Sequence, residues 1–177
     1  MVTKDKIMEL REKTGAGIMD CKGALTEAKG DIEKAVAILR QRGALVAQKK
    51  AGRVAGEGRI ESYIHHSGKI GSILEINCET DFVARTEDFK KLAKDIAMQV
   101  VATNPHYLSK EEIPKTMIEK EKLTAAELDK LYKTVCLLEQ PFIRDEKITI
   151  KDYIDSIVGK VGEKIVVKRF LRYQLGE

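Results

Sequence analysis

Apolar residues recur every three or four positions along most of the first fifty residues, which is the pattern of amphipathic helices that bury one side. Thr3 is expected to cap the first helix and Asp31 the third. Gly43 is expected to end the third helix. The expected helices cover residues 4–13, 18–28 and 32–43, with a fourth helical piece over 44–52. Together they predict a small helical domain over residues 1–52.

After residue 58 the pattern changes to an alternation of apolar and polar residues, which predicts two β-strands. The strands are expected over residues 59–66 and 69–78, joined by a hairpin turn at Ser67 and Gly68. Alternate residues of the second strand place four apolar side chains on one face: Ile70, Leu74, Ile76 and Cys78. The glycine-punctuated segment 53–58 predicts a linker between two domains.

Helical periodicity returns after the second strand. Thr86 is expected to cap a helix whose apolar stripe begins at Phe89, and Asn104 and Pro105 are expected to end it. The pattern is weaker over residues 109–138, where a helical segment is expected.

The last thirty residues predict one more helix and one more strand. Thr149 is expected to cap the helix, and Gly162 follows its end. The final strand is expected to place Ile165, Val167, Leu171 and Tyr173 on one face. Two strands, then helices, then a strand predict an α+β core over residues 59–177 with an antiparallel sheet.

The segment 78–85, between the second strand and the next helix, contains a carboxylate, an aromatic ring and a cation within five positions. Asp81 and Arg85 are four residues apart and are expected to pair across a short helical turn, which Thr80 or Asp81 caps. Phe82 is either a core residue or a probe for a partner. Because Phe89 already supplies the core aromatic ring of the next helix, the pattern favours outward projection of Phe82.

Composition and charge narrow the class of protein. Charged residues make up 34% and hydrophobic residues 43% of the 177, as in ordinary globular proteins. No apolar run approaches the ~18 residues of a membrane span, and the N-terminus lacks the apolar core of a signal peptide. We therefore expect a cytoplasmic protein that makes no membrane contact.

The charge is uneven along the chain. Residues 1–55 hold 12 Lys and Arg against 7 Asp and Glu, so the helical domain is basic. A basic domain fits an acidic protein face or RNA. The chain has no Trp and only 5% aromatic residues, which argues against a stacking platform for single-stranded nucleic acid.

The residues capable of chemistry do not form a recognisable catalytic or metal site. Cys21, Cys78 and Cys136 are far apart and form no C-x-x-C pair, which argues against a disulfide framework and a zinc site. His65 and His66 are adjacent on an expected strand, where side chains alternate between faces, so a shared metal ion is not expected. Cys78 lies on the apolar strand face, which disfavours a nucleophile paired with either histidine. We expect no cofactor and no enzyme activity.

Four stretches resemble the translation elongation factor Ts family, the guanine-nucleotide exchange factors of elongation factor Tu. They are Leu10 to Lys22, Asn77 to Arg85, Leu138 to Phe142 and Arg169 to Glu177, and they occur in the family's order over nearly the whole chain. The resemblance implies a ubiquitin-associated-like three-helix domain followed by an antiparallel-sheet and helix core. It also implies the function: binding elongation factor Tu with GDP, displacing Mg²⁺ and promoting GDP release during translation elongation.

The resemblance further implies two contacts with the G domain of elongation factor Tu. The N-terminal helices make one, and the turn after the second strand makes the other, with Asp81 and Phe82 wedged near the partner's magnesium and phosphate site. The implied contact residues are Arg11, Ile18 and Met19 in the helices, Thr80, Asp81, Phe82, Val83 and Arg85 in the turn, and His65 at the hairpin. Thr80 to Val83 is the segment associated with dislodging the magnesium ion.

The chain also departs from the long members of this family, which duplicate the core and insert a coiled-coil arm. It has one core copy and no heptad arm, which resembles the short form that pairs with itself, so we expect a homodimer. The segment from Glu119 to Tyr132 is abridged even for a short form.

An alternative interpretation is a helical protein- or RNA-binding adaptor attached to a structural core, which requires no role for Asp81 or Phe82. Salt-sensitive RNA binding without any effect on a GTPase would support it. The favoured interpretation expects elongation factor Tu as the partner and no direct nucleic-acid contact.

Overall fold

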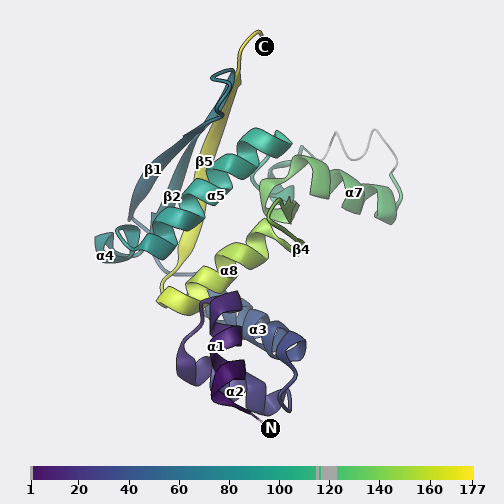
Figure 1. The fold of residues 1–177 in the computed structure, drawn as a ribbon. Helices are drawn as coiled ribbons and strands as arrows, with labels where there is room; N and C mark the ends of the chain where they lie inside the picture. Colours follow the sequence, from purple (N-terminus) through teal and green to yellow (C-terminus); the bar gives the residue numbers. More distant parts are fainter. Residues whose placement is uncertain (1, 115, 117–122) are drawn as a thin grey trace.

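The computed structural model describes residues 2–114, 116 and 123–177, and it confirms the expected α+β class, with three helices followed by an antiparallel sheet and further helices. Figure 1 shows the N-terminal helices at the end of the molecule opposite the hairpin turn and the C-terminus. The N-terminal helices are α1 (Lys4–Thr14), α2 (Ile18–Glu27) and α3 (Ile32–Lys50). The three strands of the main sheet are β1 (Glu57–Ile64), β2 (Ile70–Cys78) and β5 (Ile165–Gln174). Between β2 and β5 lie α4 (Asp81–Ala84), α5 (Glu87–Thr103), η1 (Lys110–Glu112), α7 (Ala125–Val135), η2 (Leu137–Glu139), β3 (Pro141–Phe142), β4 (Asp145–Thr149) and α8 (Ile150–Val161).

The N-terminal helices begin where the sequence predicts and enclose a small core of their own. The Thr3 hydroxyl accepts a hydrogen bond from the Lys6 amide at 3.4 Å, and the Asp31 carboxylate accepts one from the Lys34 amide at 3.0 Å. Both are N-cap bonds that satisfy otherwise unpaired amides. The core consists of Leu10, Cys21, Ala24, Leu25, Ala28 and Ala35.

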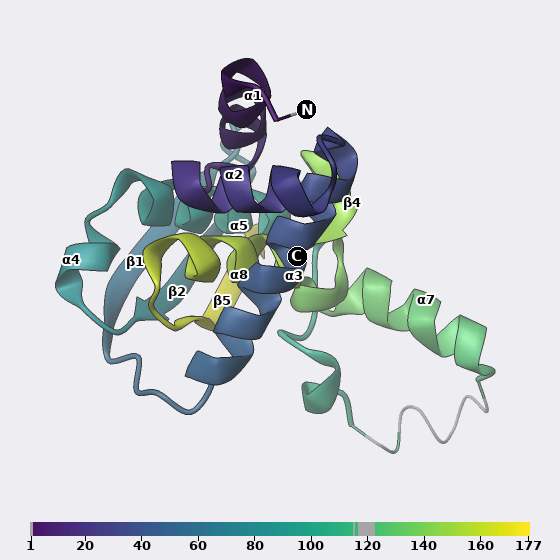
Figure 2. The same ribbon diagram turned by 90° about the horizontal axis from the view of Figure 1, so that it is seen from below.

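Helix α3 corrects one expectation. Gly43 does not end this helix, which continues without a break to Lys50. A Cβ atom at Gly43 would lie 2.9 Å from the Asp155 carbonyl oxygen, and one at Gly159 would lie 3.0 Å from the Gly43 Cα. The two glycines therefore let the backbones of α3 and α8 meet at a close crossing (Figure 2). The glycine that resembled a helix stop is a packing position.

The main sheet has the order β1-β2-β5, with antiparallel pairing throughout. Helix α5 lies across one face of it (Figure 1). Thr86 caps α5 as predicted, and Asn104 ends the helix with a left-handed conformation at φ 46°. Phe89 is fully buried against the sheet, together with Leu74, Ile76 and Cys78 of β2. Burial of this face supplies most of the core.

The last strand corrects a second expectation. Ile165 and Val167 are buried as predicted, but Leu171 and Tyr173 are exposed on the opposite face. The pairing of β2 with β5 shifts register between Glu75 and Ile76, so that one extra residue of β5 is accommodated there. Such a bulge moves every later side chain to the other face, because strand side chains alternate with a period of two.

The segment after α5 is less regular than predicted. Of the expected helical segment 109–138, the described residues form η1, α7 and η2, while residues 115 and 117–122 lie outside the described part of the chain. Thr124 and Glu127 form a capping box at the start of α7, and Thr149 and Asp152 form another at the start of α8. α4 and α7 lie on opposite sides of the core (Figures 1 and 2). Among the described residues, no helix is long and apolar enough to cross a membrane.

Candidate functional site

The turn that carries the aromatic ring is a single helical turn with a defined start. Thr80 has an extended conformation at φ −130°, and its hydroxyl accepts a hydrogen bond from the Val83 amide at 3.4 Å. The Thr86 hydroxyl donates to the Val83 carbonyl at 2.7 Å while it also caps α5. A helix of four residues has almost no stability of its own, so these side-chain bonds at both ends define its position.

Neighbouring side chains of α4 point in opposite directions. Phe82 is 76% exposed, whereas Val83 is 5% and Ala84 8% exposed and both belong to the main core. The outward projection of Phe82 is thus confirmed. Val83, which the resemblance implies as a contact, faces the protein interior and anchors the turn instead.

The charged pair on this turn is also present. The Arg85 guanidinium donates to the Asp81 carboxylate at 2.7 Å, as the spacing of four residues predicts. Both side chains are mostly exposed. Such a pair contributes at most about 1 kcal/mol to stability. It places a carboxylate and a cation on the surface beside the Phe82 ring.

The thiol of Cys78, at the end of β2 just before the turn, is not suited to act as a nucleophile. Cys78 is buried, and its thiol donates to the Thr80 carbonyl oxygen at 3.1 Å. Burial raises the pKa of Cys78 to about 11, with the nearby Glu163 carboxylate as the next cause. A buried thiol of high pKa is a poor nucleophile.

Two glutamates link the segment just before α4 to the segment just before β5: Glu163 binds Thr80, and Glu79 binds Lys164. The Glu163 carboxylate accepts from the Thr80 amide at 3.0 Å and from the Thr80 hydroxyl at 2.7 Å. The Glu79 carboxylate accepts from the Lys164 amide at 2.7 Å and from the Arg53 guanidinium at 3.1 Å. The Lys164 amide is the main cause that lowers the pKa of Glu79, followed by Arg53. Sequence reasoning missed Glu163, since no local signal links it to a residue 83 positions away.

The residues implied as the second contact surface lie on the N-terminal helices. Ile18 is 51% and Met19 76% exposed on the first turn of α2, and Arg11 is exposed on α1. The loop between these helices adjoins the core, because a Cβ at Gly15 would lie 3.1 Å from the Lys160 ammonium nitrogen. Lys160 in turn contacts Asp88 of α5 at 2.6 Å. The loop between α1 and α2 therefore lies against the core where α8 ends and α5 begins.

The structure does not bring His65 to this region. His65 follows the end of β1 at the hairpin turn, whereas α4 follows the opposite end of β2. The paired strands between them span roughly 24 Å. The ring centroids of His65 and His66 are only 4.1 Å apart, so the expectation that they point to opposite faces is wrong, since β1 ends at Ile64. No group of three metal-ligating side chains occurs in the part of the chain that the structure describes.

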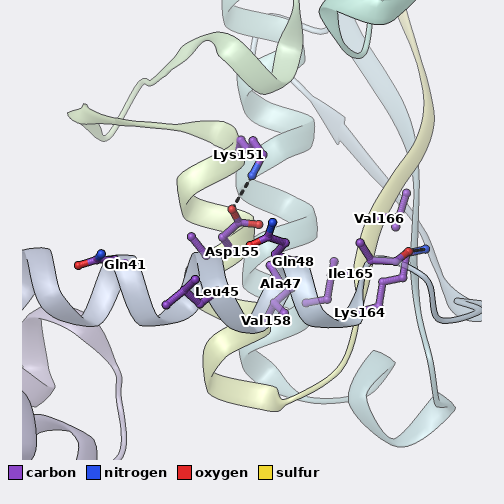
Figure 3. Close-up of a pocket in the computed structure, with 12 residues that line it drawn as sticks. Gln41, Leu45, Ala47, Gln48, Lys151, Asp155, Val158, Lys164, Ile165 and Val166 are labelled. Atoms are coloured by element: carbon purple, nitrogen blue, oxygen red, sulfur yellow. Dashed lines mark hydrogen bonds and ion pairs between the residues drawn. The ribbon is translucent and has the colours of Figure 1, made fainter.

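A separate groove of about 570 Å³ lies between α3, α8 and the start of β5 (Figure 3). Its lining includes Gln41, Leu45, Gln48 and Lys164, and an ion pair of 2.6 Å between Lys151 and Asp155 at one edge. None of its lining residues comes from the α4 turn. The groove and the exposed ring are thus different features of the surface.

The fold and the exposed turn define a class: an α+β protein that presents a fixed aromatic side chain beside a charged pair, an arrangement typical of binding surfaces. Comparison with known families matches residues 21–127 and 121–177 to the family described as "Elongation factor TS". This chain belongs to the elongation factor Ts family.

Individual members of the family are similar in sequence to this chain over nearly its whole length. "Elongation factor Ts" of Carboxydothermus hydrogenoformans is 50% identical over 196 aligned positions, which cover 100% of this chain and 90% of the relative. "Elongation factor Ts" of Caldanaerobacter subterraneus subsp. tengcongensis is 49% identical over 100% of this chain and 98% of the relative. The protein of that name from Fervidobacterium nodosum is 49% identical over 99% of each. These alignments are longer than the 177 residues of this chain, so the relatives have positions without a counterpart here.

Proposed function

We propose that this protein is a guanine-nucleotide exchange factor that binds elongation factor Tu with GDP, displaces Mg²⁺ and promotes GDP release during translation elongation. Family membership supports the general role. The observation that carries the mechanism is the exposed Phe82 ring on a turn fixed at both ends. Thr80, Asp81, Phe82, Val83 and Arg85 form the turn, which acts near the partner's magnesium site.

The proposed mechanism displaces the partner's loops that hold GDP and Mg²⁺, and it requires no covalent chemistry. A GTPase holds GDP through Mg²⁺ and a set of charge-assisted hydrogen bonds to the phosphates, which depend on precise positions of its loops. An apolar ring that packs between the partner's elements shifts those loops and weakens the metal and phosphate contacts together. The ring must be rigidly held for this, because a mobile side chain would adapt to the partner instead of displacing it.

Thermodynamic linkage then relates the binding of this protein to the binding of nucleotide by the partner. A ligand shifts an equilibrium only through different affinities for the two states, so this protein binds nucleotide-free partner more tightly than the GDP-bound form. By reciprocity, nucleotide and Mg²⁺ weaken the binding of this protein by the same factor. No covalent bond forms or breaks, so the proposed role is not that of an enzyme.

The N-terminal helices are proposed as the second contact, through Arg11, Ile18 and Met19. Two apolar side chains on one exposed helical turn are suited to a groove on a partner protein. His65 lies too far from the α4 turn to act with Phe82, so any contact that it makes is a separate one.

We further propose that the outer face of the main sheet joins two copies of this chain. Five exposed apolar side chains lie on this face, opposite α5: Ile60, Ile64, Ile73, Leu171 and Tyr173. Leu171 pairs with Ile73 across β2 and β5, so the patch is continuous over neighbouring strands. Exposed apolar patches of this kind mark interfaces. Sedimentation equilibrium should give a dimer for the native chain and a monomer for Leu171→Lys, and a native monomer would exclude this arrangement.

Release of a fluorescent GDP analogue from elongation factor Tu tests the proposed function directly. Addition of this protein should accelerate release, and rising Mg²⁺ should oppose the acceleration because the metal and the factor bind competitively. The same amount of heat-unfolded protein serves as the control. Unchanged release would refute the exchange function, and salt-sensitive RNA binding in the same preparation would then support the adaptor alternative.

A further inference from the structure

The residue at the start of the α4 turn is also held by a glutamate that lies far from the turn in the sequence. Glu163 is the second residue after α8 and follows Gly162, which adopts a left-handed conformation at φ 74°. This conformation reverses the chain and leads directly into β5, which pairs with β2. The side chain of Glu163 therefore reaches Thr80, the second residue after the end of the neighbouring strand β2.

The bonds from Glu163 determine how α4 begins. One carboxylate oxygen binds the Thr80 amide at 3.0 Å and the other binds the Thr80 hydroxyl at 2.7 Å. Because the hydroxyl hydrogen is directed to Glu163, an oxygen lone pair stays available for the Val83 amide, which is the cap bond of α4. Hydrogen bonds to an ionised carboxylate are among the stronger ones in proteins. Phe82 is two residues beyond Thr80, so the direction of its ring follows from this cap.

The segment that carries Glu163 is itself held firmly. Glu79 binds the Lys164 amide, and the Lys164 ammonium group donates to the carbonyl oxygens of Ala51 at 2.6 Å and Arg53 at 2.8 Å. Arg53 completes the set by donating to Glu79. These contacts connect the residues after α3 with the start of β5 and the end of β2. A fixed Glu163 can therefore hold α4 in one orientation rather than follow its movements.

We propose that Glu163 is a positioning residue for nucleotide exchange, which holds Thr80 so that α4 presents the Phe82 ring in a fixed direction. This inference rests on the proposed function. Glu163 acts through Thr80 and needs no contact with the partner. Loss of its carboxylate leaves α4 with a weakened cap and a mobile ring.

The mobility of the ring can be measured without any partner. The chain contains no tryptophan, so Phe82→Trp introduces a single tryptophan at the exposed position, which can be excited selectively over the five tyrosines. In this background, Glu163→Ala should lower the residual anisotropy of the tryptophan on the nanosecond timescale, and Glu163→Gln should have a smaller effect because it keeps one acceptor oxygen. Glu146→Ala, at an exposed glutamate of β4, is the matched control and should change nothing. Equal anisotropy decays in all variants would overturn the proposal.

The exchange assay with Phe82 intact gives the second readout. Glu163→Ala should lower the maximal rate of stimulated GDP release about tenfold, a modest loss beside the hundredfold that misplacement of a working group can cause. The concentration for half-maximal effect should change much less. Glu163→Gln should recover part of the rate, and urea unfolding should confirm that each variant is folded. A mobile ring with an unchanged rate would refute the positioning role.

The failure of this inference can be separated from failure of the proposed function. If the native protein does not stimulate release, the exchange function is refuted, and the anisotropy arm still decides whether Glu163 holds the ring. If the native protein stimulates release and Glu163→Ala equals it in both readouts, only the positioning role is refuted.

Discussion

Two phenylalanines seven residues apart show how differently this chain uses the same side chain. Phe89 on α5 is 0% exposed and packs against the sheet, whereas Phe82 on α4 is 76% exposed. Helix α5 has 17 residues and is held by its buried stripe, while α4 has four residues and is held by buried Val83 and Ala84 together with polar bonds at its ends. Burial alone secures the long helix, whereas the short helix that exposes a ring also needs hydrogen bonds at both ends. Substitutions at the two positions should therefore affect different properties.

The largest expected effect on stability is at the buried ring. Phe89→Ala removes a fully buried aromatic side chain and leaves a cavity, so the free energy of unfolding should fall by about 3–5 kcal/mol. Phe82→Ala is the matched control and should change it by less than about 0.5 kcal/mol. Urea denaturation followed by circular dichroism measures both. Equal losses would mean that Phe82 is a core residue and that the comparison is wrong.

A smaller loss in the free energy of unfolding is expected where the backbones of α3 and α8 cross. Gly43→Ala places a methyl group 2.9 Å from the Asp155 carbonyl oxygen, so the helices must separate, at a cost of about 1–3 kcal/mol. The control is Gly52→Ala, because a Cβ at Gly52 has nothing within 4 Å. Its unfolding midpoint in urea should remain close to that of the native protein. If Gly43→Ala also leaves the midpoint unchanged, the close crossing is not a packing constraint.

The third prediction concerns the reactivity of a thiol and not the stability of the fold, at the strand end that leads into the exposed turn. With the pKa of Cys78 raised to about 11, its thiolate fraction at pH 8 is about a hundredfold smaller than that of an ordinary exposed thiol. Iodoacetamide should therefore modify Cys78 slowly in the native protein and rapidly after unfolding in urea. Peptide mapping by mass spectrometry locates the label. Rapid modification of native Cys78 would revive a chemical role for this residue.

The sequence predicts local features well and distant contacts poorly, for a physical reason. Caps at Thr3, Thr86 and Thr149 follow from residue type and from the periodicity beside them. The outward projection of Phe82 follows from the stripe that begins at Phe89. These signals lie within a few residues of the feature that they predict.

Three features depended on contacts between distant segments. Gly43 was expected to end a helix, but its role is set by α8, more than a hundred residues later. The faces of Leu171 and Tyr173 depend on the register of β5 against β2, which the alternation in one strand does not reveal. Glu163 holds Thr80 only because two strands pair. Periodicity within one element carries no information about its neighbours, so these features needed the structure.

The most direct test of the account is the rate at which Phe82→Ala stimulates GDP release from elongation factor Tu, measured by stopped-flow fluorescence. The native protein and Phe82→Ala are compared at saturating concentration, with circular dichroism to confirm that both are folded. If the exposed ring acts as the wedge, its loss should lower the stimulated rate about thirtyfold, the equivalent of about 2 kcal/mol for a central aromatic contact. A folded Phe82→Ala variant that stimulates release as fast as the native protein would contradict the account.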